Sequence, residues 1–289
     1  MAAGPKPIFA MMAGMALLLA PGCLGPQTRS QRSGLMDYLY PKRDAAPAPN
    51  PAGARLTLPL KLGVVFVPST TGSWRVSNLV TPAGERPLLD VVKEAFKGRS
   101  WVGEIKVIPS SYLTARGGFD NLDQVSRMYG VDVMALVSVD QIQYTDPKWY
   151  AFAYLSIVGA YALPGDSNDT RTLIDAAVFH VPTRTFLLRA PGQSVVKGSS
   201  TLVNREERLR ANSGRGLELA MKELAKNLET EVETFKAQVA SGERKGVDVI
   251  DRQGQSLKQT GGKDFGGSFG GVEVLAGLAL AAALWRRRR

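Results

Sequence analysis

The spacing of hydrophobic residues changes several times along the chain, and each change predicts a new element. A run rich in Leu and Val over 56–68 predicts a buried strand that ends at a proline. Apolar residues at helical spacing predict an amphipathic helix over 86–97, and alternation predicts a strand over 101–109. A helix over 121–130, closed by a glycine, and a long strand over 131–145 follow. The first half of the chain is therefore expected to alternate strands with helices.

The second half predicts three further strands and one long helix. Apolar runs separated by turn residues predict strands over 151–164, 170–182 and 184–199, the last two joined as a hairpin. Residues 205–240 predict a helix with one narrow apolar stripe, which is typical of a helix that packs on a core. The stripe contains Leu217, Ala220, Leu224, Leu228, Val232, Phe235 and Val239.

The order of these elements, β-α-β-α-β-β-β-β-α, predicts an α/β (α+β) domain over 55–240 with a mixed β-sheet and a long C-terminal helix. Gly214 and Gly216 are expected to interrupt that helix before its stripe begins, because glycine is a poor helix former. The apolar stretch 149–164 is interpreted as part of a buried core strand rather than as a transmembrane hairpin.

The first 22 residues have the anatomy of a secretory signal peptide. Lys6 supplies a positive charge, an apolar run covers 8–20, and small residues precede Cys23. A cysteine placed directly after such a signal resembles that of bacterial lipoproteins. The resemblance implies that residues 1–22 are removed and that Cys23 becomes a lipid-carrying N-terminus, and Leu24 in place of Asp implies sorting to the outer membrane. The alternative is an ordinary cleaved signal followed by a chance cysteine.

Residues 23–54 are expected to form a lipidated tether between the signal and the body. The stretch 44–54 is rich in Pro and Ala, which predicts an extended chain. The segment 33–43, SGLMDYLYPKR, is too apolar for a simple linker. We expect it to dock on the body; the alternative is that it anchors a partner protein.

The composition leaves few residues for catalysis or metal binding. The chain has one cysteine and one histidine, so it forms no internal disulfide and no Cys-based zinc site. His180 lies on a predicted strand without a second histidine, and the chain lacks Gly-x-Ser-x-Gly, Walker and dinucleotide-binding motifs. We therefore expect no catalytic residue, no metal ligand, no cofactor other than lipid on Cys23, and no enzyme activity.

The net charge of +10 does not by itself indicate a nucleic-acid-binding protein. Four of the positive charges stand together at the end of the chain, and those of the body are interspersed with acidic residues. A mildly basic surface of this kind would also suit anionic lipid headgroups. Nucleic acid is therefore not an expected partner.

The end of the chain combines a linker, a short apolar segment and an arginine cluster. Residues 241–265 are polar and dotted with glycine, which predicts a flexible linker. A helix over 269–285 would span about 25 Å, less than the hydrocarbon core of a bilayer, and it contains Glu273, which is costly in lipid. A cluster with the features of a stop-transfer signal follows, formed by Arg286, Arg287, Arg288 and Arg289. The segment is therefore a poor permanent anchor.

Residues 266–289 resemble the GlyGly-CTERM sorting tail of Gram-negative bacteria. The motif consists of Gly266, Gly267, Ser268, Phe269, Gly270 and Gly271. The resemblance implies cleavage near Gly266–Gly267 by rhombosortase, an intramembrane serine protease. With the lipoprotein signal and the sequence DYLYP at 37–41, the whole chain resembles the rhombotarget lipoprotein family. A plain C-terminal anchor is the alternative for this tail.

These features predict an exported lipoprotein at the outer membrane or cell surface, held only transiently in the inner membrane by its C-terminal segment. Rhombosortase, the lipoprotein-processing and sorting machinery and the membrane are its expected partners. The body is expected to be a non-catalytic binding or envelope-assembly module. An alternative follows from the element order and from YGVDVMALVSVDQI at 129–142, which resemble periplasmic lipoproteins of the curli-secretion type. That resemblance implies a homo-oligomeric envelope or secretion accessory.

Overall fold

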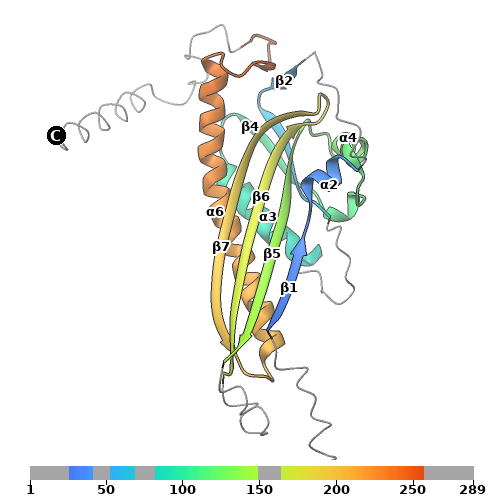
Figure 1. The fold of residues 1–289 in the computed structure, drawn as a ribbon. Coiled ribbons are helices and arrows are strands. Elements are labelled where there is room, and N and C mark those ends of the chain that lie inside the picture. The colour runs from blue at the N-terminus through green and yellow to red at the C-terminus, as the bar shows by residue number, and fades with distance from the viewer. Residues whose placement is uncertain (1–25, 42–52, 69–81, 149–163, 257–289) are drawn as a thin grey trace, which may run out of the picture.

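A mixed sheet with helices on both faces forms the body, which confirms the predicted α+β class (Figure 1). The structure is a computed structural model and describes residues 26–41, 53–68, 82–148 and 164–256. The strands are β1 (Gln27–Arg32), β2 (Ala54–Thr57), β3 (Leu60–Phe66), β4 (Val102–Val107), β5 (Val133–Pro147), β6 (Asp166–His180), β7 (Thr185–Ser200) and β8 (Val247–Ile250). The helices are α2 (Leu35–Leu39), α3 (Pro82–Phe96), the 3-10 helix η1 (Ser110–Tyr112), α4 (Gly118–Tyr129) and α6 (Arg205–Ala240).

The main sheet has the order β4-β3-β5-β6-β7, with β1 paired to β5 as well. β3 is parallel to β4 and β5, whereas β5, β6 and β7 are antiparallel to one another in turn. Two strands share one edge of β5: β3 pairs with 133–137 and β1 pairs with 140–145. The predicted hairpin is confirmed as β6 and β7, whereas the strand predicted over 151–164 lies outside the described residues apart from Pro164. Strands of fifteen or sixteen residues are about 50 Å long, which sets the length of the body.

Side chains that alternate across the strands form one core on each face of the sheet. The core under α3 and α6 includes Val64 and Leu224, and the core under α2 and α4 includes Leu122 and Met134, all of them completely buried. The two cores explain why β3 and the first part of β5 are apolar at nearly every position: both of their faces are covered.

Helix α6 is continuous from Arg205 to Ala240, so the predicted interruption at Gly214 and Gly216 is wrong. Gly216 faces the sheet, where a Cβ atom would stand 2.7 Å from Thr172 Oγ1, and its carbonyl accepts a hydrogen bond from Ser194 Oγ. Gly216 therefore allows close approach of the helix to the sheet instead of ending the helix. No helix in the described ranges has both the length and the apolar character needed to cross a membrane.

The described part of the segment 33–43, residues 33–41, docks on the body through α2, as expected. Tyr38 and Leu39 are buried, and the Tyr38 hydroxyl lies 3.1 Å from Asn121 Oδ1 on α4. Burial raises the pKa of the Tyr38 phenol well above its ordinary value. The structure differs from the sequence interpretation in one respect: residues 27–41 belong to the body rather than to a tether, because β1 fills the part of the β5 edge that β3 leaves open.

The strand predicted over 56–68 divides into two strands that join different sheets. β2 pairs in parallel with β8, and β3 enters the main sheet after Leu58 and Pro59. β8 lies inside 241–265, which was expected to be a flexible linker. Its alternating pattern, with Val247 and Val249 buried and Asp248 exposed, explains why this part of the segment is ordered.

Candidate functional site

The site residues predicted from the two ends of the chain lie outside the described residues. These are Cys23, the glycine-rich motif at 266–271 and the arginines at 286–289. The described body begins three residues after Cys23 and ends ten residues before Gly266. Because an extended chain covers about 3.5 Å per residue, Cys23 lies within about 11 Å of Pro26 and Gly266 within about 35 Å of Ser256.

β1 begins near the end of the body where α6 starts, and α6 ends at the opposite end (Figure 1). At one end, Arg29 of β1 donates a hydrogen bond of 2.8 Å to Glu206 in the first turn of α6. At the other end, Arg244 follows the end of α6 and donates to the carbonyl of Leu187, and β8 comes directly after it. The described chain therefore enters the fold near one end of α6 and continues from the other end into β8.

His180 is packed into the turn between β6 and β7. Its side chain is buried, and Nδ1 lies 2.6 Å from Thr183 Oγ1, which in turn lies 2.8 Å from Thr185 Oγ1. Burial lowers the pKa of His180 from its ordinary value, and the nearby charge of Asp132 opposes that effect. The described residues contain no group of three His, Cys, Asp or Glu side chains that could hold a metal ion. His180 acts here as a neutral side chain that orders the turn.

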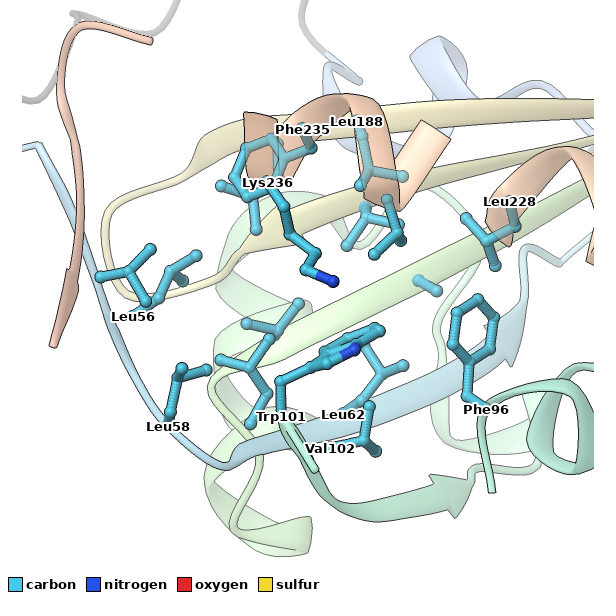
Figure 2. Close-up of a pocket in the computed structure, with 17 residues that line it drawn as sticks. Leu56, Leu58, Leu62, Phe96, Trp101, Val102, Leu188, Leu228, Phe235 and Lys236 are labelled. Carbon is cyan, nitrogen blue, oxygen red and sulfur yellow. The ribbon is translucent and has the colours of Figure 1, made fainter. Parts of the chain in front are cut away.

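An apolar pocket lies between the sheet and the C-terminal half of α6, and it is the candidate site of the body (Figure 2). Its cavity volume is about 70 Å³. The sheet supplies the floor, with Val133 and Ala135 of β5 almost completely buried. β2 and β8 close one side through Leu56 and Val249. The remaining walls come from α3, β3, β4 and the hairpin of β6 and β7.

The apolar stripe of α6 explains where this pocket forms. Leu217, Ala220 and Leu224 of the stripe are buried against β6 and β7. Further along the helix, Val232 and Phe235 are only partly buried and line the pocket instead. The small side chain of Ala135 leaves the space beneath them open. The pocket is thus a part of the core that the helix does not fill.

Two polar groups are placed among these apolar walls. The indole Nε1 of Trp101 is buried and has no hydrogen-bond partner. The Lys236 ammonium lies 5.9 Å from the centre of the Trp101 ring and 3.0 Å from Glu233, and its side chain is 14% exposed. Figure 2 shows the lysine side chain reaching from α6 toward Trp101 across the cavity. The pocket therefore combines apolar walls with a cation and a spare N–H donor.

A second cavity, of about 340 Å³, lies where α4 ends beside the turn between β6 and β7. It is open, four of its nine lining residues are charged, and both of its arginines bind carboxylates: Arg127 pairs with Asp123 and Arg184 pairs with Asp120. The second cavity is therefore more polar and more open than the apolar pocket. The apolar pocket is the better candidate site.

Sequence patterns did not identify the pocket, although one signal for it was present. The stripe of α6 continues beyond the length that a single sheet covers, and Trp101 stands between a helix and a strand. Both features are also typical of ordinary core residues. Periodicity predicts which face of a helix is buried, but it does not predict how completely the space beneath that face is filled.

Comparisons with known proteins found no matching family model and no matching curated protein. Among solved structures, the chain is similar to a Xanthomonas campestris protein of the DUF330 family, with 11% identity, 67% of this chain and 95% of the other covered, and a TM-score of 0.31. A putative neuraminyllactose-binding hemagglutinin homolog from Helicobacter pylori has 7% identity and a TM-score of 0.33. The match covers 72% of this chain and 98% of the homolog. The PelC dodecamer from Paraburkholderia phytofirmans has 10% identity and a TM-score of 0.26. The match covers 69% of this chain and 98% of the PelC chain. Similarity at this level assigns no function to the chain.

Proposed function

We propose that the chain is an exported lipoprotein whose body is a non-catalytic binding module for an apolar ligand. The apolar pocket beneath the end of α6 is the observation that carries the binding role. Its cavity of about 70 Å³ is lined by apolar side chains of the sheet, the helix and the small β2–β8 sheet. A well-formed apolar cavity that contains few polar groups is the usual form of a small-molecule site.

In this proposal, lipid on Cys23 holds the protein at the outer membrane or cell surface, and rhombosortase removes the tail near Gly266–Gly267. Two observations support it. Both motifs lie close to the body in sequence, Cys23 three residues before Pro26 and Gly266 ten residues after Ser256. The glycines of the tail also favour the extended backbone that a protease must bind, because each costs roughly 1 kcal/mol in a helix.

The sorting proposal is tested by mass spectrometry of the full chain purified from membranes of a host that contains rhombosortase. We expect Cys23 to carry acyl chains and the chain to end near Gly266. A Cys23→Ser variant should lose membrane attachment after cleavage. An unmodified Cys23, or an intact C-terminal arginine cluster on surface-exposed protein, would overturn the sorting proposal.

The binding role is tested with a photoreactive fatty alcohol on the full chain in phosphatidylcholine nanodiscs. We expect the label on peptides that contain Ala135 or the 228–236 part of α6. Substituting Ala135→Leu fills the cavity floor and should remove the label. Equal labelling of the wild-type chain and this variant would contradict the binding role.

A homo-oligomeric envelope accessory is a second candidate function, and one observation favours it. β7 is sixteen residues long and forms the edge of the described sheet, with β6 as its strand partner. Near this edge, Leu173 and Val195 are 44% and 58% exposed. A long edge strand with exposed apolar neighbours is a surface on which a second copy can pair. A strictly monomeric full chain in analytical ultracentrifugation would contradict this candidate.

A further inference from the structure

We infer, on the basis of the proposed binding role, that the apolar pocket takes an anionic amphiphile: an acyl chain with a carboxylate or phosphate head. The acyl chain lies over Ala135, and the head binds Lys236 and the buried Trp101 N–H. A free fatty acid and a membrane phospholipid both have this chemistry.

The size of the cavity fits the end of a hydrocarbon chain. An apolar cavity of ~150 Å³ binds benzene, so one of about 70 Å³ holds about two or three methylene groups. The floor and walls that would contact them are carbon atoms of Ala135, Val133 and Leu228. Transfer of each buried methylene from water is worth roughly 0.8 kcal/mol, which is enough for binding but gives no selectivity for a head group.

Selectivity comes from the two polar groups that accompany these walls. A buried N–H without a partner costs about 1–3 kcal/mol, and Trp101 Nε1 is such a group. An acceptor oxygen on the ligand would remove that cost. An indole N–H donates only, so the partner that fits must be an acceptor, as carboxylate and phosphate oxygens are.

The Lys236 ammonium supplies the complementary charge. Lys236 Nζ donates hydrogen bonds of 3.0 Å to both carboxylate oxygens of Glu233, whose side chain is 59% exposed, so a ligand anion would take the place of a water-exposed partner. Lys236 itself is mostly covered, so a ligand oxygen near it would be screened less than one at the surface. A neutral head group could accept a hydrogen bond from this ammonium but would lack the attraction between opposite charges.

The distance between the pocket and the start of β1 favours a separate molecule, rather than the proposed lipid on Cys23, as the ligand. Gln27 pairs with Thr145 of β5, and the pocket floor at Ala135 lies ten residues away on the same strand. That separation is about 33 Å along the strand. A lipid embedded in a membrane beside Gln27 therefore lies at the far end of the body from the pocket.

The test compares three photoreactive probes that carry the same diazirine near the end of the chain. They are a fatty alcohol, a fatty acid, and a phosphatidylglycerol with that acyl chain. Each is applied to the full chain in phosphatidylcholine nanodiscs, and the labelled peptides are identified by mass spectrometry. We expect the pocket peptides to label about tenfold more strongly with at least one anionic probe than with the alcohol. Whether the fatty acid or the phospholipid gives that label identifies the source.

Matched variants separate charge from shape. Lys236→Met should reduce anionic labelling about tenfold and leave alcohol labelling unchanged, whereas Lys226→Met, on an exposed part of the same helix, should change neither. Trp101→Phe keeps an aromatic ring and removes the N–H, so it should weaken both anionic probes. Ala135→Leu should block all probes. Ala177→Leu, an equally buried position in the core on the other face, controls for general destabilisation.

The outcomes distinguish the two proposals. Pocket labelling that is equal for the alcohol and the anionic probes, and unaffected by Lys236→Met, overturns the anionic preference and leaves the apolar binding role standing. Absence of pocket labelling by every probe overturns both. If Ala135→Leu fails to fold, the comparison of Lys236→Met with Lys226→Met still decides the anionic preference, because both positions lie in the C-terminal half of α6.

Discussion

Arg205 and Asp166 form a buried ion pair that joins the first turn of α6 to the start of β6. Arg205 Nη2 lies 2.7 Å from Asp166 Oδ2, and the side chains are 11% and 0% exposed. Nearby, Arg29 and Glu206 form a second pair between β1 and the same helical turn, but their side chains are 40% and 54% exposed. The two pairs allow a direct comparison of buried and exposed charges within one region.

Arg205→Met should destabilise the protein by about 3–5 kcal/mol, because it leaves the Asp166 carboxylate buried without its partner. Arg29→Met removes an exposed pair and should cost less than about 1 kcal/mol. Urea denaturation of the full-length variants, followed by circular dichroism, measures both. Equal effects of the two substitutions would show that Asp166 is not effectively buried.

Gly192→Ala should destabilise the protein by more than about 2 kcal/mol, because adding a group to a well-packed core costs about 1–3 kcal/mol. A Cβ atom at Gly192 would stand 2.1 Å from the carbonyl oxygen of Ala220, so α6 would have to move away from β7. Gly214→Ala places its methyl group in open space on the same helix and should stabilise it by about 1 kcal/mol. Thermal unfolding midpoints should therefore shift in opposite directions; a loss of stability in Gly214→Ala would contradict a continuous α6.

Tyr38→Ala should cost about 3–5 kcal/mol, the range for removal of a large buried aromatic side chain. Tyr38 is completely buried, whereas Met36 in the same helix is 64% exposed. Met36→Ala should therefore change the free energy of unfolding by less than about 0.5 kcal/mol. If both variants had the stability of the wild-type chain, α2 would be an appendage and not a part of the body.

The stability of the protein should decrease as the pH falls below the ordinary pKa of histidine, about 6.5. Burial lowers the pKa of His180 in the folded state, so the unfolded chain binds the proton more readily. The stabilising contribution is present above the unfolded pKa and is lost as the pH falls through the folded pKa. His180→Gln should remove this part of the pH dependence. Because the chain has one histidine, its imidazole NMR signal reports the folded pKa directly, and a midpoint above the ordinary value would contradict the burial argument.

Sequence patterns predicted the elements whose apolar spacing is regular over many residues. The long helix has the predicted bounds, 205–240, because its stripe continues without a break, and β6 and β7 form the predicted hairpin around a short turn. The glycines misled the prediction of a helical break. Local propensity disfavours Gly216 in a helix, but close contact with Thr172 requires it, and that contact is visible only once the helix lies on the sheet.

Short strands and the pocket were beyond sequence prediction for a common reason. β1 is entirely polar, QTRSQR, and is a strand because β5 offers an edge more than a hundred residues away in sequence. β8 depends in the same way on β2. The pocket depends on how much of the space above Ala135 is left unfilled by α6, β2 and β8. Each of these features arises from distant partners, on which local periodicity carries no information.

The length of α6 has a mechanical consequence for the proposed precursor, which would be attached to one membrane at both ends. The helix has 36 residues and is about 54 Å long. The chain between Ser256 and Phe269 reaches at most about 45 Å when fully extended. A body pinned at both ends could not stand upright, because the extended tether is shorter than the helix, so it would lie along the membrane surface. Removal of the tail would release one end and let the body swing outward about Cys23, carrying the pocket away from the membrane.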